Sequence, residues 1–386
     1  MFAAFLYPFP VRGLPAPYLW VCYKLLGDLG AEHVAVIASA DYFRSPIELK
    51  AQGRFDCHAP INPELGFEVP TEAKLATLER AHIPTSIYRR LKAWLPCDEQ
   101  VWRFLITQVD DELVDVICHK VTTISAGRAC EGLITWCNFA SLREAARRLG
   151  LPVLHCELGP LRRPRLRGLG YLDFRGVNGC TEAQARQENA PDLPQHFRDL
   201  DELRRFFGLP AADEHPAPDA ALGVPLQVED DSNVLAYGRG FDMNLLLRYA
   251  EEAFAQNDIL IRPHPGARFL PKPTRRIDTS TTSTEFVLRC ERILSLNSSV
   301  AVEALLLGRP VTMLGESPAS HIAGRSVAEP RRATQRELEF LLLNYFVPYE
   351  LVFDLDYFRW RLTGPSEAAI RRRHLEHWES SPATIA

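Results

Sequence analysis

Residues 293–308 read ILSLNSSVAVEALLLG: an apolar run, a few small polar residues, and a second apolar run that ends at glycine. The first run predicts a buried strand, and the pattern from Ser298 to Leu307 predicts a helix. Small polar side chains at such a joint can cap the helix or bind an anion, because the first N–H groups of a helix lack partners within it. The stretch therefore indicates a parallel α/β sheet with polar groups at its carboxyl edge.

A second stretch, residues 259–265, has the same layout and reads ILIRPHP. Its apolar run predicts a strand that leads into Arg262, and Pro263 and Pro265 restrict the backbone on both sides of His264. A fixed imidazole at a strand end suits a contact to phosphate, or proton donation to a leaving phosphate. A single histidine is more often structural, but Arg262 and the serines of the first stretch favour a phosphate site.

Glu303 is a carboxylate within the helix predicted after Ser299. Four positions separate the two residues, so they lie on the same helix face, one turn apart. The helix is otherwise apolar, and a carboxylate in such a setting needs a partner. Ribose hydroxyls and a buried arginine are both suitable partners, and the pattern leaves both open.

Two further carboxylates follow predicted strands, one in each half of the chain. Asp231 closes the acidic run 229–231 after a strand predicted at 224–228, and Glu157 follows a strand predicted at 151–156. Three adjacent acids repel one another in a dry site, so the run is either a solvated loop or holds a catalytic acid. Two carboxylates that face one cleft can divide the nucleophile and acid/base roles of glycosyl transfer.

Strand-like and helix-like segments alternate through both halves of the chain, which is typical of parallel α/β sheets. A linker rich in proline, alanine and acids at 209–219 separates the halves. We therefore predict two Rossmann-like domains that face a central cleft, at residues 1–220 and 221–365, and a C-terminal helix at 366–386. Within the second domain we also predict a strand at 232–237.

The overall composition is that of a globular protein without a strong charge bias. Hydrophobic residues make up 46% and charged residues 24% of the 386 positions, and the net charge of −5 does not favour nucleic acid as a partner. The nine cysteines lack metal-ligand spacing and fit reduced thiols, so we expect a cytoplasmic protein without a metal. No apolar stretch reaches the ~18 residues that span a bilayer. Membrane contact would then be peripheral, at the cytoplasmic face of the inner membrane, through the basic run 371–373.

Four of these segments resemble, in sequence order, motifs of bacterial retaining β-Kdo glycosyltransferases of capsule and O-antigen (lipopolysaccharide) synthesis. The first is Glu-Leu-Gly-Pro-Leu at 157–161, and the second is Pro-Leu-Gln at 225–227 with Asp-Ser at 231–232. The third is the His-Pro motif at 264–265, and the fourth is the Ser-Ser motif at 298–299 with its glutamate. This resemblance implies a GT-B-like fold of two Rossmann-like domains, with residues 1–220 on the acceptor side and residues 221–365 binding the CMP-sugar donor.

The resemblance also implies the reaction: Kdo moves from CMP-β-Kdo to a bacterial surface glycan or lipid-linked glycan, with retention, by double displacement. Asp231 would be the nucleophile, with Asp230 as the alternative, and Glu157 would activate the acceptor hydroxyl or assist departure. His264 would contact the phosphate and take part in the catalysis. CMP carries one phosphate, so neither a metal nor another cofactor is expected.

The implied donor-binding set covers the phosphate, the ribose or cytosine and the sugar carboxylate. Ser298, Ser299 and His264 would hold the phosphate, Glu303 the ribose or cytosine, and the turn 238–240 the sugar carboxylate. The complete set is Arg262, His264, Asn297, Ser298, Ser299, Glu303, Gly238, Arg239 and Gly240.

Three other functions fit the same sequence pattern. An inverting sialyltransferase would use CMP-sialic acid, and the anomeric configuration of the product separates it from a retaining enzyme. A non-catalytic module would bind a polysaccharide end and would not release CMP from CMP-Kdo. A sugar-nucleotide epimerase would act on UDP-sugars and need no acceptor.

Overall fold

The computed structural model describes residues 1–11, 13–51, 65–190, 193–267, 269, 271–272 and 274–380. The chain divides into two compact units. The first consists of Met1–Glu157, Tyr171–Val177 and Tyr349–Pro365, and the second of Leu158–Gly170, Asn178–Pro348 and the chain from Ser366 on. The domain division at residue 220 stays a prediction, and the last six residues of the predicted C-terminal helix lie outside the described residues.

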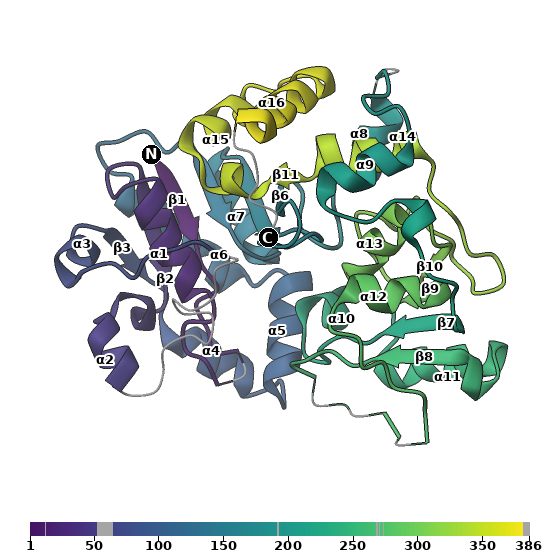
Figure 1. Cartoon of the computed structure of the whole chain (residues 1–386). Helices are drawn as coiled ribbons and strands as arrows, with labels where there is room; N and C mark the ends of the chain where they lie inside the picture. Colours follow the sequence, from purple (N-terminus) through teal and green to yellow (C-terminus); the bar gives the residue numbers. More distant parts are fainter. Residues whose placement is uncertain are drawn as a thin grey trace. The chain divides into compact units, whose positions relative to one another are not determined.

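The larger sheet has seven strands in the order β11-β6-β5-β4-β1-β2-β3. Figure 1 labels β1, β2, β3, β6 and β11 of this sheet. The strands are β1 (Phe2–Phe5), β2 (Val34–Ala38), β3 (Glu79–His82), β4 (Gly132–Thr135), β5 (Val153–Leu158), β6 (Leu169–Asp173) and β11 (Val347–Pro348). The pairs β1–β2, β1–β4, β2–β3 and β4–β5 are parallel, whereas β11 pairs antiparallel with β6. The chain therefore adds β2 and β3 on one side of β1. It then returns to the other side of β1 and adds β4, β5 and β6 there.

Capping residues mark the ends of several helices in the first unit. They are α1 (Leu19–Asp28), α2 (Pro46–Ala51), α3 (Glu72–Ala76), α4 (Thr85–Lys92), α5 (Asp98–Thr107), α6 (Asp111–Ile124), α7 (Ala140–Leu149) and α15 (Leu355–Leu362). Asp110 caps α6 through Leu113 N–H, and Gly150 ends α7 with a left-handed φ of 66°. The late segment Tyr349–Pro365 belongs to this core, where the Phe353 ring stacks on Trp136 with centroids 5.3 Å apart.

The second sheet has four parallel strands in the order β10-β9-β7-β8. They are β7 (Ala220–Pro225), β8 (Ile259–Arg262), β9 (Cys290–Ser295) and β10 (Val311–Met313). Leu222, Val224, Ile261 and Leu294 of these strands form one apolar core with residues of α11. The predicted class, an α/β protein with two parallel-rich sheets, is confirmed.

The helices of the second unit include four between the strands and four others (Figure 1). They are α8 (Ala183–Asn189), α9 (Leu200–Phe207), α10 (Ser232–Tyr237), α11 (Met243–Ala253), α12 (Ser283–Leu288), α13 (Val300–Leu306), α14 (Gln335–Phe340) and α16 (Glu367–Ser380). The strand predicted at 232–237 is wrong, because this segment is α10. Asp231 accepts the Asn233 N–H and starts a helix there, which overrides the strand-like pattern.

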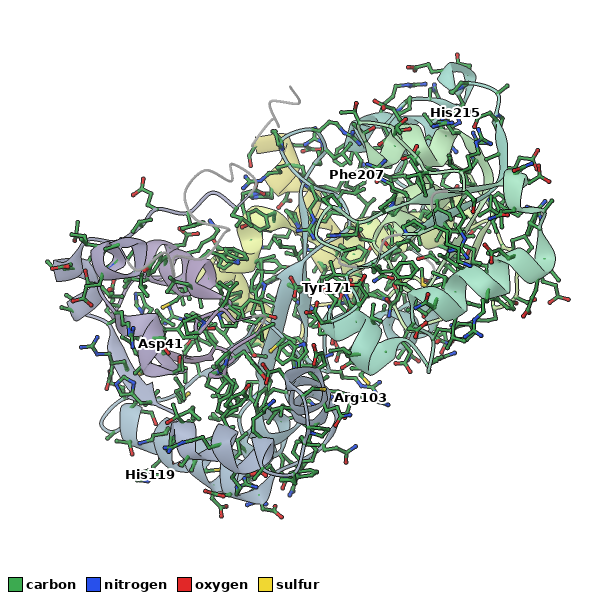
Figure 2. The ribbon with its side chains drawn as sticks, turned by 90° about the horizontal axis from the view of Figure 1, so that it is seen from below. Asp41, Arg103, His119, Tyr171, Phe207 and His215 are labelled. Atoms are coloured by element: carbon green, nitrogen blue, oxygen red, sulfur yellow. The ribbon has the colours of Figure 1, made fainter. Side chains whose placement is uncertain are left out.

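Figure 2 draws the side chains and labels Phe207 and Arg103 among others. The Phe207 ring is fully buried in the second unit, whereas Arg103 of α5 is exposed. Within the described part of the chain, no helix is both long and apolar enough to cross a membrane.

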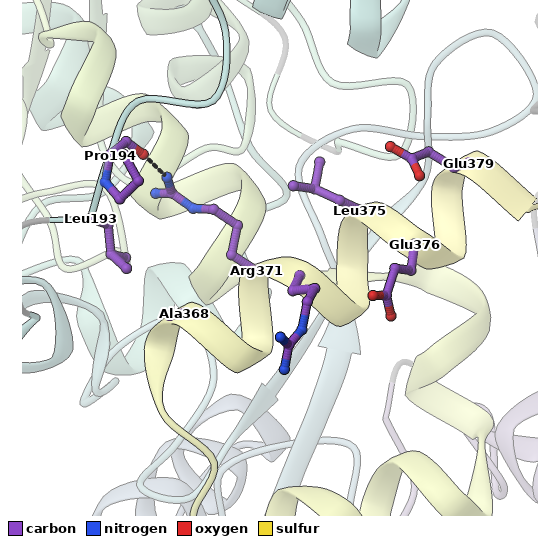
Figure 3. Close-up of a pocket in the computed structure, with 8 residues that line it drawn as sticks. Leu193, Pro194, Ala368, Arg371, Leu375, Glu376 and Glu379 are labelled. Atoms are coloured by element: carbon purple, nitrogen blue, oxygen red, sulfur yellow. Dashed lines mark hydrogen bonds between the residues drawn. The ribbon is translucent and has the colours of Figure 1, made fainter.

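The basic run 371–373 is not a uniform cationic surface. Arg371 is only 8% exposed, and its guanidinium donates to Asn344 Oδ1 at 2.7 Å. It also donates to the Pro194 carbonyl at 2.7 Å (Figure 3). It lines a cavity of about 320 Å³ between Pro194 and α16. Arg371 is therefore engaged inside the fold, and peripheral membrane contact through the run 371–373 stays a prediction.

His155 on β5 makes the first unit sensitive to acid. Its ring is fully buried, and burial, aided by the Arg143 charge, lowers the pKa to about 3. The pKa in the unfolded chain is about 6.5, so below that pH the unfolded chain binds one proton more than the folded chain. We expect the free energy of unfolding to fall by about 1.4 kcal/mol per pH unit from this group as pH drops from about 6.5 towards 3.

The measurement for His155 is urea unfolding of wild type and His155→Asn between pH 7 and pH 5. Asparagine keeps a donor near Nδ1, which lies 3.3 Å from the Asp173 carbonyl. We expect the variant to lose less stability on acidification than wild type does. If the free energy of unfolding falls equally with pH in both proteins, the burial of His155 does not cause the acid sensitivity.

Candidate functional site

The candidate site lies at the carboxyl edge of the second sheet. Because β7, β8, β9 and β10 are parallel, the loops that follow them meet at one edge. From β7 the chain goes to β8 on one side and then crosses to β9 on the other side. This reversal places the loop after Pro225 beside the loop after Ser295, which is where ligands bind in open α/β sheets.

Side-chain amides join these two loops. Gln227 Nε2 donates to Asn297 Oδ1 at 2.9 Å, and Asn297 N–H donates to Gln227 Oε1 at 3.2 Å. Asn297 Nδ2 also donates to the Asn233 carbonyl at 2.9 Å, and Asn297 is 7% exposed. The Asn297 side chain is therefore engaged with the protein and fixes the site, whereas its predicted role as a phosphate ligand stays a prediction. Gln227 was not singled out for a role, although an amide at a strand end was the available signal.

Asp231 stands at the start of α10, half-buried at the sheet edge. Its Oδ1 accepts the Asn233 N–H at 2.8 Å, so the backbone holds the carboxyl group at the helix start. In the same acidic run, Glu229 Oε1 accepts the Phe269 N–H at 2.5 Å. The run is thus a structured loop, and an acid held in this way can act as a nucleophile towards a sugar placed over the sheet edge.

The two serines differ in their contacts. Ser298 Oγ accepts the Val300 N–H at 3.3 Å, and Ser298 N–H donates to Ser295 Oγ at 3.0 Å. Ser299 is exposed at the N-cap position of α13, and its side chain makes no capping hydrogen bond. Ser298 Oγ therefore serves in part as a local cap, whereas the Ser299 hydroxyl does not cap α13.

Glu303 is buried in a small polar cluster under α13. It is 3% exposed, its Oε2 accepts the Ser283 hydroxyl at 2.8 Å, and its Oε1 accepts the Thr284 hydroxyl. Arg165 donates to the same Thr284 hydroxyl and lies 3.6 Å from Glu303 Oε1. The chain thus supplies both hydroxyls and an arginine as partners. The threonine- and serine-rich segment 279–284 was the signal for the hydroxyls, and nothing in the sequence pointed to Arg165.

Arg262 and His264 follow β8. Arg262 Nη1 pairs with the buried carboxylate of Asp278 and donates to the Ser280 carbonyl at 3.0 Å, so part of its charge is used within the fold. His264 is exposed, and its Nδ1 accepts the Gly266 N–H at 3.0 Å. In the neutral ring Nε2 then carries the proton.

The turn 238–240 lies between α10 and α11. A Cβ at Gly238 would come within 2.6 Å of the Val234 carbonyl oxygen, and Gly240 has a φ of 85°. Arg239 itself has a left-handed φ of 51°, and its Nε lies 3.8 Å from Glu316 Oε1 after β10. Left-handed backbone at a residue other than glycine is strained, and such strain is common at functional sites. In this turn the Arg239 guanidinium lies near the Glu316 carboxylate.

Glu157 belongs to the first unit, where it lies within β5 rather than after it. It is half-buried, and its charge adds to the burial that raises the pKa of the Cys137 and Cys156 thiols. In the segment that follows, Gly159 N–H donates to the Leu169 carbonyl at 2.7 Å, and a Cβ there would collide with this backbone. The Glu157 role stays a prediction.

A family of known proteins matches the N-terminal part of the chain. Residues 4–182 match the model of the Glycosyltransferase 99 family N-terminal domain, which is just under half of the chain. This part of the chain therefore carries a glycosyltransferase-family domain. A comparison with curated protein sequences finds no match.

Solved structures share only a distant likeness with the chain. A Thermosulfurimonas dismutans KpsC structure, a beta Kdo 2,7 transferase, has 20% identity and a TM-score of 0.43 over 69% of this chain and 90% of that chain. A second, the beta Kdo 2,4 transferase, has 18% identity and a TM-score of 0.40 over 54% and 78%. Methanocaldococcus jannaschii UDP-GlcNAc 2-epimerase has 12% identity and a TM-score of 0.32 over 89% and 98%.

Proposed function

We propose that the chain is a retaining β-Kdo glycosyltransferase, which transfers Kdo from CMP-β-Kdo to a bacterial surface glycan. One observation carries the proposal: Asn297 accepts a hydrogen bond from Gln227 and donates one to the Asn233 carbonyl, which ties the Asp231 loop to the Ser-Ser loop at the reversal point of the second sheet. A nucleophile and a phosphate-binding segment must be held at such a fixed spacing if one donor is to contact both. The glycosyltransferase-family domain supports the same class of reaction.

In this proposal the donor lies along the sheet edge. Ser298, Ser299 and the Nε2–H of His264 contact the single phosphate, and Arg239 contacts the sugar carboxylate. Asp231 attacks the anomeric carbon, the C–O bond to the phosphate breaks, and CMP departs with the bonding electron pair. An acceptor hydroxyl, activated by Glu157, then displaces Asp231, so two inversions give net retention.

The nucleotide is the part of this proposal that is simplest to test. We expect CMP to raise the thermal unfolding midpoint of the protein, whereas UDP and GDP at the same concentration leave it unchanged, because a ligand stabilises the state that binds it. Differential scanning fluorimetry with the three nucleotides is the measurement. A shift with UDP but not with CMP would reject the Kdo donor and favour a UDP-sugar enzyme.

A further inference from the structure

Asn233 carries a buried polar atom that the hydrogen bonds described so far do not use. Its Oδ1 is buried, and among the described residues no donor bonds to it. Buried acceptors are almost always paired, because an unpaired one loses its water without gaining a replacement. A residue that keeps such an atom next to a candidate site is suited to receive a donor from a ligand.

The backbone of Asn233 is held from two sides, which fixes where its side chain starts. Its N–H donates to Asp231 Oδ1 at 2.8 Å, and its carbonyl accepts Asn297 Nδ2 at 2.9 Å. On the same short helix, Val234 and Tyr237 are buried in the core, whereas Asn233 is half-buried. Asn233 therefore lies at the sheet edge, where its backbone contacts both the predicted nucleophile and Asn297, the residue before the Ser-Ser motif.

We propose that the Asn233 carboxamide binds a hydroxyl group of the donor sugar and so helps to determine which sugar is transferred. The inference rests on the proposed function, since it places a sugar next to Asp231. A sugar hydroxyl donates to the carboxamide oxygen and completes its hydrogen bonding only when the donor is bound. The nucleotide part of the donor does not contact this group, so CMP affinity is independent of Asn233.

The test compares wild type, Asn233→Ala and Asn244→Ala, a control on the exposed face of α11. For Asn233→Ala we expect kcat/KM for CMP release from CMP-Kdo to fall about 10- to 100-fold, the usual range for one lost hydrogen bond in a closed site. CMP affinity should stay within about twofold of wild type, and the thermal midpoint should stay equal or rise, because the buried unpaired acceptor is removed. The control should match wild type in all three.

Donors that lack one hydroxyl give the second measurement. The analogue that lacks the hydroxyl bound by Asn233 should lower kcat/KM of wild type. The same analogue should cause no further loss with Asn233→Ala, because the contact is already absent in that variant. The proposal is overturned if Asn233→Ala keeps full turnover, or if its thermal midpoint and its CMP affinity fall together. It is also overturned if every analogue lowers kcat/KM by the same factor with wild type and with Asn233→Ala. Wild type that binds CMP but releases none from CMP-Kdo overturns the proposed function and this inference with it.

Discussion

Asp231→Asn is expected to lower CMP release from CMP-Kdo by a factor on the order of 1,000 or more, because it removes the group that attacks the sugar. The structure makes asparagine the sharper replacement. Asp231 Oδ1 caps α10 through the Asn233 N–H, and asparagine caps a helix as well as aspartate does. Asp231→Ala would lose that cap as well, at a cost of about 1 kcal/mol of stability. CMP affinity and the thermal midpoint of Asp231→Asn should therefore stay close to wild type.

Asp242→Asn is the matched control for this change. Asp242 caps α11 through the Leu245 N–H at 2.8 Å and is exposed, so the same substitution is made at the same kind of position. Asp230→Asn tests the neighbouring acid of the run. Near-normal turnover by Asp231→Asn together with loss by Asp230→Asn would move the nucleophile by one residue, and near-normal turnover by both would reject a nucleophile in this loop.

Glu303→Gln is expected to weaken CMP binding about 10- to 100-fold, because hydrogen bonds from ribose hydroxyls to a charged acceptor are stronger than those to a neutral amide. The same change places an amide against the Ser283 and Thr284 hydroxyls and leaves Arg165 without its carboxylate. We therefore also expect a loss of stability of about 1–3 kcal/mol. Isothermal titration with CMP and urea unfolding measure the two effects separately.

Two further variants separate the roles of Glu303. Glu285→Gln is the control, because Glu285 is exposed on α12 and its Oε2 accepts the Thr281 N–H at 3.0 Å. Arg165→Gln removes the arginine partner and keeps the carboxylate. If Glu303→Gln binds CMP as wild type does, and Arg165→Gln loses the same stability, Glu303 is a structural partner of Arg165 and not a nucleotide ligand.

Much of the fold could be predicted from local patterns. The cap Asp110 starts α6 and Gly150 ends α7, and such signals can be recognised in a sequence because caps act within a few residues. The segment 232–237 was predicted wrongly as a strand because its composition fits both structures, and only the Asp231 cap selects a helix. The return of Tyr349–Pro365 to the first unit depends on contacts far apart in the sequence, such as Phe353 on Trp136, which no local pattern contains.

The candidate site was predictable only in part, for the same reason. Strand ends locate His264 and the serines, since parallel strands bring their carboxyl ends to one edge. The partners of these groups come from elsewhere in the chain. Arg165 reaches Thr284 across more than a hundred positions, and Gln227 reaches Asn297 across seventy. Spacing along the chain cannot reveal such pairs, so the pairing of Gln227 with Asn297, the contacts of Arg165 and the unpaired Oδ1 of Asn233 emerge only from the structure.

The most direct test of the central claim is the release of CMP from CMP-Kdo by the purified wild-type protein, compared with Asp231→Asn and with a UDP-sugar as donor. We predict steady CMP release by wild type, none above background by the variant, and no UDP release from the UDP-sugar. If wild type releases no CMP, or if it releases UDP from the UDP-sugar instead, the chain is not a CMP-Kdo-dependent transferase.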